Sequence, residues 1–342
     1  MKKVSLKNKR YTRARQLYEL KRRKWANGTL KRSRSKPQKR TRKPDFVDAV
    51  APREFTLEPS NVKKSLAYIG KVKKIGKQKK DVNFILEDVE KIGIGAISML
   101  ISVMQELEEK NVYFKGIKPN KEEAKDVLEQ SGFMKFVDGT ISEKNRLTKN
   151  VIFTTGKSNT HQKIIVDAIH KANHTVWGEY GRSPLLYGTL VEMIKNSCKH
   201  AFMSKEKVRW HIAINHDIVN KKVKFSFVDN GIGIVKSFEK DDAARTIKGI
   251  IRNNAQMIKL AYTKGIESKT GLSWRGTGLP TIYESFDEDK IIRRLVVITN
   301  DVYADFENNT QMTLRKTFSG TYYYWEIDTE CVKHSFVNDD SD

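Results

Sequence analysis

Hydrophobic and polar positions from residue 81 onward alternate between strand and helix patterns. We expect a strand at 81–87, a helix at 93–110, a second strand at 112–116 and a short helix at 121–130. The longer helix has one apolar face (Ile97, Leu100, Ile101, Met104 and Leu107). Parallel strands need a crossover connection, so this order over about 60 residues predicts parallel strands joined by right-handed crossovers.

A different pattern, helices followed by hairpin-forming strands, occupies the C-terminal half. Two helices are predicted at 160–176 and 185–201. Strands are predicted at 208–215, 223–228, 295–299, 311–318 and 321–327. The long stretch 235–275 contains a further predicted helix at 243–260, and its end is expected to be a mobile flap. The two patterns place the chain in the α/β (α+β) class.

Charge divides the chain differently. Residues 1–80 hold 28 Lys and Arg but 5 Asp and Glu, whereas the remaining residues hold 37 and 36. Within the basic part, 61–80 combine a lysine cluster with spaced apolar residues, and 31–44 are punctuated by Ser and Pro. We therefore expect a basic arm at 1–60, extended or partly helical, then α/β domains at 61–150 and 151–342.

The arm interleaves arginines with aromatic side chains. Tyr11, Tyr18 and Trp25 provide stacking surfaces, and arginines neutralise phosphates. The candidate nucleic-acid contacts are Arg10, Arg13, Arg15, Arg22, Arg23, Trp25, Arg32, Arg34, Arg40 and Arg42. A nucleic acid, DNA or RNA, is the favoured partner of residues 1–44. An anionic membrane surface and a merely solubilising tail remain alternatives.

Composition limits the class of protein further. The longest apolar run, from Ile94 to Val103, is too short and too interrupted to cross a bilayer. Cys198 and Cys331 provide neither a disulfide framework nor the ligand spacing of a zinc site. We expect a cytoplasmic protein without a transmembrane segment.

Three short segments carry the candidate chemistry, and the first lies on the helix at 185–201. Glu192, Asn196 and His200 follow at intervals of four residues and form a polar stripe beside the apolar face. Taken alone, such a stripe commonly faces solvent. An Asn oxygen beside a carboxylate can nevertheless coordinate Mg²⁺, which takes most of its other ligands from phosphates and water.

The second segment, Asp229 to Gly233, follows a predicted strand. Its sequence is also typical of an ordinary turn. Gly231 and Gly233 suit a backbone that passes closely under a flat ring. Asp229, at the end of a strand in apolar surroundings, is a candidate acceptor for an exocyclic amine such as that of adenine.

The third segment is Arg275, Gly276, Thr277, Gly278 and Leu279. Pro280 follows, near the first turn of a predicted helix, so the backbone N–H groups before it suit an anion such as phosphate. The segment lacks the ending of a P-loop and the third glycine of a dinucleotide fingerprint. Thr321 opens the last predicted strand and is expected beside Asp229.

In this order, the segments resemble the nucleotide-binding boxes of the GHKL ATPases, over residues 160–328. The resemblance implies a Bergerat-type α/β sandwich with a mixed sheet and a lid. It further implies that Asn196 binds Mg²⁺, that Asp229 and Thr321 contact adenine, that Gly276 to Leu279 hold phosphate, and that Glu192 is the base. The run after Asn196 is most similar to the anti-sigma serine kinases.

Residues 81–137 resemble a STAS domain, the module of anti-sigma-factor antagonists. The resemblance rests on 84–92, on the helix after Gly95 and on 127–133. The phosphoacceptor turn of that family corresponds to 93–96 here, which contains no hydroxyl. A phosphorylated serine switch at this turn is therefore not expected, although a protein partner of the STAS-like domain is.

These features favour an ATP-binding protein that hydrolyses ATP slowly and acts as a conformational switch. The alternative is a serine/threonine kinase of the anti-sigma type that acts on a STAS-like partner, and a module that only holds ATP is a third option. His161, His170 and His174 lack the sequence context of a histidine-kinase phosphoacceptor. The sequence leaves open whether a homodimer closes the pocket.

Overall fold

The computed structural model describes residues 44–131, 133–137, 151–156, 162–181, 183–201, 209–239, 251, 253–265 and 278–333. The chain divides into two units, 1–43 and 44–342. The ten candidate arm residues, from Arg10 to Arg42, therefore lie outside the described residues.

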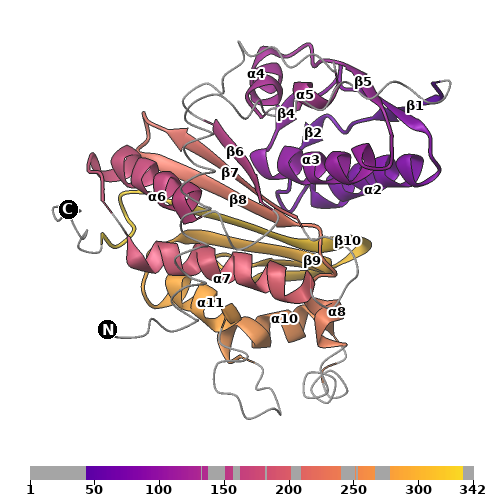
Figure 1. Cartoon of the computed structure of the whole chain (residues 1–342). Coiled ribbons are helices and arrows are strands. Elements are labelled where there is room, and N and C mark those ends of the chain that lie inside the picture. The colour runs from indigo at the N-terminus through magenta and orange to yellow at the C-terminus, as the bar shows by residue number, and fades with distance from the viewer. Residues whose placement is uncertain are drawn as a thin grey trace, which may run out of the picture. The chain divides into compact units, whose positions relative to one another are not determined.

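The N-terminal part of the second unit contains parallel strands and helices (Figure 1). Its strands are β1 (Phe46–Val50), β2 (Glu54–Phe55), β3 (Asp81–Ile85), β4 (Lys91–Ile92) and β5 (Phe114–Ile117). Its helices are α2 (Val62–Lys77), α3 (Ile94–Glu108), α4 (Glu122–Gln130) and α5 (Met134–Val137). One sheet has the order β1-β3-β5, a second joins β2 to β4, and all these pairs are parallel. The predicted parallel pairing is confirmed.

The expected start of this part at residue 61 is wrong. β1 pairs with β3 along its whole length, and the backbone N–H of Asp45 donates to Asp81 Oδ2 at 3.1 Å. The boundary lies at residue 44 instead. The cause is local: β1 is short, and Asp48 interrupts its apolar pattern, so its sequence carries a weak strand signal.

The C-terminal part contains one five-stranded sheet. Its strands are β6 (Val151–Gly156), β7 (Trp210–Asp217), β8 (Lys222–Asp229), β9 (Arg293–Asp305) and β10 (Thr310–Ile327), in the order β6-β7-β8-β10-β9. Its helices are α6 (Gln162–Trp177), α7 (Pro184–Ala201), α8 (Ile234–Phe238), α10 (Asn254–Thr263) and α11 (Gly278–Asp287). The two strands expected at 311–318 and 321–327 form the single strand β10, with irregular register in between.

This sheet is antiparallel throughout its described pairs, and the expected mixed sheet is not found. The reason is the position of β10. The helical crossover from β8 to β9 makes these two strands parallel to each other, but β10 inserts between them and is antiparallel to both. Among the described residues, parallel pairing occurs in the sheets of the N-terminal part alone.

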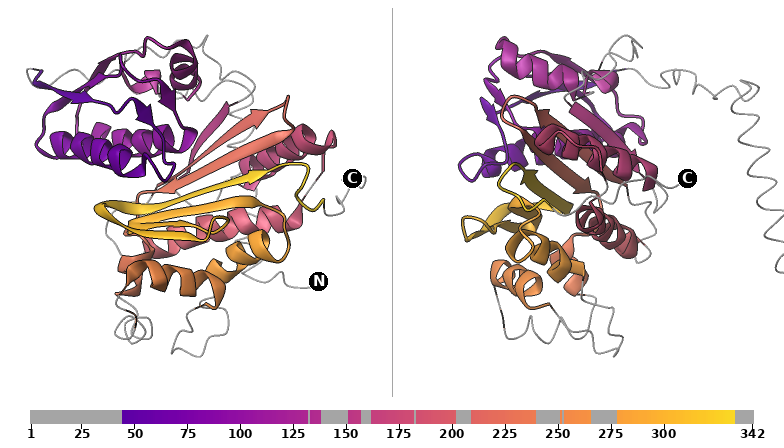
Figure 2. Two further views of the ribbon diagram at one scale, coloured as in Figure 1. Left: turned by 180° about the vertical axis from the view of Figure 1, so that it is seen from behind. Right: turned by 90° about the vertical axis from the view of Figure 1, so that its left-hand side faces the viewer.

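Both faces of the five-stranded sheet are covered by helices (Figures 1 and 2). Alternation along β10 sends Tyr323 and Trp325 into a core shared with α6, α7, α10 and α11. Tyr322, together with Val228 and Ile298, enters a second core shared with α2 and α3. The predicted domains at 61–150 and 151–342 therefore share a hydrophobic core within one unit.

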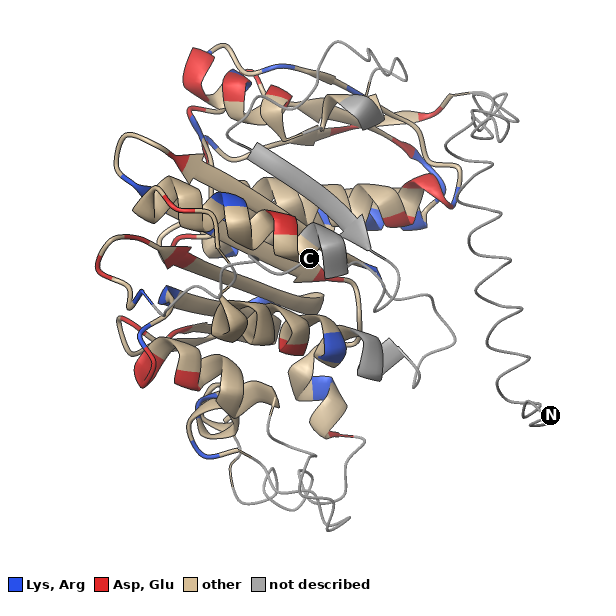
Figure 3. Ribbon diagram, turned by 60° about the vertical axis from the view of Figure 1, so that its left-hand side comes forward, with Lys and Arg blue, Asp and Glu red and all other residues tan. Residues whose placement is uncertain are grey.

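Acidic and basic residues are interspersed along the described ribbon (Figure 3). No helix among these residues is long and apolar enough to cross a membrane.

Candidate functional site

The centre of the candidate site is Asp229, the last residue of β8, with 4% of its surface exposed. Its Oδ1 accepts hydrogen bonds from the backbone N–H groups of Gly231 (2.8 Å) and Thr321 (3.1 Å). Its Oδ2 accepts one from the Ser197 hydroxyl of α7 (2.9 Å). The structure thus places Thr321 beside Asp229, as the sequence predicts.

Burial raises the pKa of Asp229, and hydrogen bonds from Gly231, Ser197 and Thr321 oppose this rise. The carboxylate thus accepts from two backbone N–H groups and from the side chains of Ser197 and Thr321. In this buried position a matching donor is strongly selected, because an unpaired polar group is costly there.

The chain that leaves Asp229 turns sharply at Gly233, where φ is +84°. A Cβ on Gly233 would lie 2.4 Å from Asn300 Oδ1 of β9, so only glycine fits. Asn300 holds the turn from both sides: its Nδ2 donates to the Ile232 carbonyl (2.8 Å), and its Oδ1 accepts from Lys236 N–H (3.2 Å). The Thr299 hydroxyl accepts from Ile234 N–H at 2.8 Å.

The approach of Thr321 to Asp229 depends on Gly320. Its φ is +120°, and a Cβ there would lie 2.0 Å from the Asp229 carbonyl oxygen. This residue coincides with the irregular register of β10 between Phe318 and Thr321. The irregularity therefore lets the backbone of β10 pass directly over the end of β8.

The polar stripe on α7 faces the start of α11. A Cβ on Gly278, the first residue of α11, would lie 3.0 Å from both Asn196 Oδ1 and Glu192 Oε2. Glu192 also pairs with Lys195 at 2.7 Å. The Asn196 Nδ2 atom is buried and has no hydrogen-bond partner among the described residues. α7 and α11 are joined further by a 2.6 Å hydrogen bond between the hydroxyls of Thr189 and Ser285.

Part of the predicted site cannot be placed. Arg275, Gly276 and Thr277 lie outside the described residues, as do the expected flap at the end of 235–275 and residues 240–250, where the predicted helix at 243–260 begins. Gly278 and Leu279 begin α11 as expected, and Leu279 packs against the core beneath the helices. His161 and the side chain of His200 also lie outside what the structure describes.

Sequence reasoning missed three residues of the site: Ser197, Thr299 and Asn300. Ser197 directly follows Asn196, but its bond to Asp229 spans 32 residues of sequence. Thr299 and Asn300 lie on a strand that carries no motif. Only the polar run from Thr299 to Asp301, in the middle of the largely apolar β9, signals them in the sequence.

The chain matches no protein-family model, and no curated protein matches its sequence.

Proposed function

We propose that the protein binds Mg-ATP around Asp229 and acts as a nucleotide-dependent conformational switch of the GHKL type, with a Bergerat-type fold. One observation carries the proposal: segments that are far apart in sequence meet at one place. Asp229 contacts Ser197 and Thr321, and the start of α11 lies against Glu192 and Asn196.

Each part of the site suits one part of the ligand. The buried carboxylate of Asp229 suits the exocyclic amine of adenine, which would replace one of its hydroxyl donors. The Asn196 side chain suits Mg²⁺, a cation that prefers oxygen ligands and would polarise the phosphates. The N-terminus of α11, a helix of ten residues, suits phosphate because its backbone N–H groups and dipole favour an anion. Arg275, Gly276 and Thr277 complete the proposed phosphate segment.

Glu192 is the proposed base that activates water. Its carboxylate lies on the same helix face as Asn196, one turn away, and both approach Gly278. The ion pair with Lys195 is exposed enough to exchange partners, since the side chains are 25% and 55% exposed. Hydrolysis of ATP, rather than transfer to a protein hydroxyl, is the reaction we propose.

The link from the nucleotide site to the rest of the unit runs through β10. Thr321 contacts Asp229, and the next residue, Tyr322, points to the other face of the sheet. There a Cβ on Gly95 of α3 would lie 2.0 Å from the Tyr322 hydroxyl oxygen. A shift of β10 on nucleotide binding therefore displaces α3, the helix of the proposed STAS-like part. The partner of the switch is a nucleic acid, bound through residues 1–44.

Asp229→Asn tests the nucleotide site, with Asp305→Asn as the matched control. Asp305 is also a buried aspartate at the end of a strand, and it bonds only Asn308 by the described hydrogen bonds. Calorimetric titration with Mg-ATP should show a loss of affinity of at least about tenfold for Asp229→Asn alone. Absence of ATP binding by the unaltered chain, or equal losses in both variants, contradicts the proposal. Labelled ATP separates hydrolysis, which gives free phosphate, from kinase activity, which labels protein.

A further inference from the structure

The helix α2 carries an unusual exposed face. Its solvent side consists of five lysines together with Ala67, Gly70 and nothing acidic, since α2 contains no Asp or Glu. The five, named here the α2 surface, are Lys63, Lys64, Lys71, Lys74 and Lys77. The opposite side of the helix, including Leu66, Ile69 and Val72, is buried in the core.

Within the described part of the chain, no lysine of the α2 surface forms an ion pair or a side-chain hydrogen bond. Three other lysines are paired instead: Lys110 with Glu106, Lys118 with Glu129 and Lys125 with Glu122. Lys73, at the edge of α2, is paired with Glu106 as well. Two acidic side chains that precede the helix in sequence are engaged elsewhere, Glu54 with Asn61 and Glu58 with Lys91.

Lys74 and Lys77 lie in the last turn of α2, where the helix dipole favours cations, but the rest of the arrangement works against the stability of the helix. Lys71, Lys74 and Lys77 follow at intervals of three residues, a spacing at which like charges repel. Lys63 and Lys64 lie in the first turn, where the helix dipole disfavours cations. Among the described residues no acidic side chain pairs with these lysines, which leaves that role to a partner.

The middle of the α2 surface has only small side chains. Ala67 and Gly70 lie between Lys63 and Lys74 along the helix axis, and at 100° per residue all four fall on one face, within about 60° of one another. Gly70 is exposed, and a Cβ there would meet nothing within 4 Å. Glycine in a helix interior is destabilising, and here the protein's own packing does not require it. A partner that approaches the helix backbone closely would explain the glycine at this position.

A groove beside α2 extends the positive surface. Lys63 and Leu66 of α2 form one wall, and Leu314, Arg315 and Lys316 of β10 form the other. Arg315 and Lys316 are exposed and form no ion pair with any described residue. The groove therefore adds two cations on the side of α2 that faces β10.

We propose that the α2 surface binds the phosphodiester backbone of a nucleic acid. Lysines act as point charges on phosphates and position a duplex without reading its sequence. From Lys63 to Lys77 the helix rises about 21 Å, which corresponds to about six base pairs of duplex. The surface has no large apolar side chain, which an amphipathic helix needs to enter a membrane interface and a protein interface needs at its centre. This site is distinct from the ATP site and from the arm.

The test uses the full chain with Lys64→Gln, Lys71→Gln and Lys74→Gln combined. The control combines Lys110→Gln, Lys118→Gln and Lys125→Gln, which removes the same charge from paired lysines. Fluorescence anisotropy with a short duplex DNA, and with a duplex RNA of equal sequence, gives the affinity against salt. For DNA, the log–log slope should fall by about 2 to 3 in the α2 variant, because each phosphate contact contributes about 0.9.

An unchanged slope in the α2 variant, or an equal change in the control, overturns the proposal. So does binding to phosphatidylglycerol vesicles without binding to either duplex. A reduced slope with DNA, with RNA or with both supports it, and the more affected probe identifies the nucleic acid. Calorimetry with Mg-ATP on the same α2 variant should match the unaltered chain, so a failure of the nucleotide proposal stays distinguishable.

Discussion

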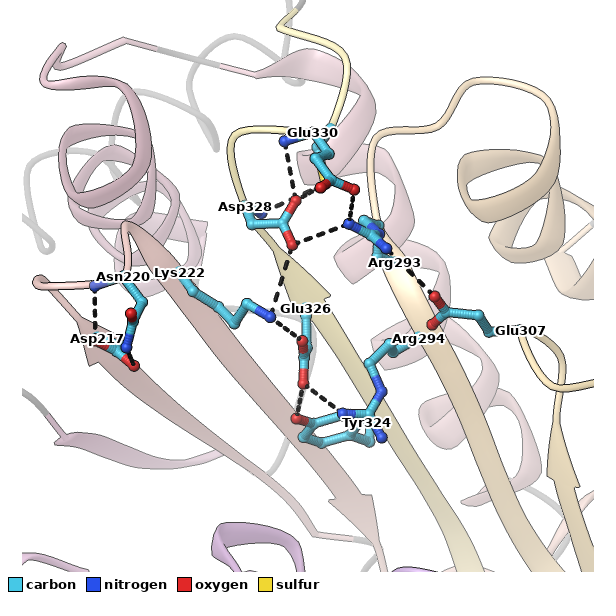
Figure 4. Close-up of polar contacts among 11 residues, drawn as sticks. Asp217, Asn220, Lys222, Arg293, Arg294, Glu307, Tyr324, Glu326, Asp328 and Glu330 are labelled. Atoms are coloured by element: carbon cyan, nitrogen blue, oxygen red, sulfur yellow. Dashed lines mark hydrogen bonds and ion pairs between the residues drawn. The ribbon is translucent and has the colours of Figure 1, made fainter.

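Cations at the α2 surface and cations at the ends of β8, β9 and β10 have very different neighbours. At the strand ends, Lys222 and Arg294 both contact Glu326, at 3.0 Å and 3.2 Å (Figure 4). Arg293 contacts Asp328, Glu307 and Glu330. The side chain of Glu326 is 2% exposed, and although burial alone would raise its pKa, Tyr324, Lys222 and Arg294 lower it.

The two groups of charges contribute to different processes, folding at the strand ends and binding at the α2 surface. At the strand ends, cations and carboxylates from three strands satisfy one another, so the free energy of their interaction belongs to folding. At the α2 surface the cations repel one another, and the free energy of pairing them becomes available only to a partner. The composition of a segment does not distinguish these cases, because both contain lysine on regular secondary structure.

The largest expected effect is that of Glu326→Ala on stability. The substitution leaves Lys222 and Arg294 without their central carboxylate. We expect a loss of about 2 to 3 kcal/mol in the free energy of unfolding, less than for a fully buried pair because both cations are partly exposed. Denaturant unfolding measures it, and Glu330→Ala is the matched control: its side chain is 74% exposed, so we expect a change below about 0.5 kcal/mol. Equal losses in the two variants would contradict the contribution of Glu326 to folding.

Acid should weaken the cluster at the strand ends in a defined range of pH. This strand-end cluster consists of Lys222, Arg293, Arg294, Glu307, Glu326, Asp328 and Glu330. The pKa of Glu326 is lower in the folded protein than its ordinary value of 4.5. Its contribution is therefore complete above pH 4.5 and is lost as the pH falls through the lowered pKa. The loss should be smaller than for Glu326→Ala, because a protonated carboxyl keeps its shape. Unfolding free energies across this range should fall less steeply for Glu326→Gln than for the unaltered chain, and parallel curves would contradict the assignment.

Local periodicity predicted much of the fold. The alternation from β3 to α4 indicated parallel pairing, and the apolar face of α3 is buried as expected. It could not predict that β10 inserts between β8 and β9, since the order of strands depends on contacts between segments far apart in sequence. For the same reason it gave separate domains where α2 and α3 share a core with the five-stranded sheet.

In the candidate site, too, residues in local motifs were predicted and residues defined by long-range contacts were not. Asp229, Thr321, Glu192 and Asn196 belong to short motifs whose residue types have chemical reasons, and the structure brings them into two contacting groups. Ser197 and Asn300 carry no such local signal, because their roles arise from hydrogen bonds across more than 30 residues. The strand-end cluster was equally invisible: Lys222 and Glu326 become neighbours only through the pairing of β8 with β10.

A smaller effect is expected for Gly70→Ala in the middle of the α2 surface. The new Cβ meets nothing within 4 Å, so alanine should stabilise the protein by about 0.5 to 1 kcal/mol through its helix propensity. Gly76→Ala is the control in the same helix, because its Cβ would lie 2.5 Å from Leu107 and should destabilise. Thermal or denaturant unfolding compares them. If Gly70→Ala destabilises the isolated protein, the glycine has a structural role and is no longer evidence for a partner that approaches α2 closely.

The smallest expected effect on stability is that of removing three lysines from the α2 surface. In the absence of nucleic acid, combining Lys64→Gln, Lys71→Gln and Lys74→Gln removes repulsion and no described ion pair, so stability should stay equal or rise by a few tenths of a kcal/mol per residue. Because exposed charges are screened, any gain should shrink as salt increases. The paired-lysine control should instead lose up to about 0.5 kcal/mol per pair. Denaturant unfolding at low and high salt distinguishes these results, and a clear loss of stability in the α2 variant would show that its lysines serve the fold as those of the strand ends do.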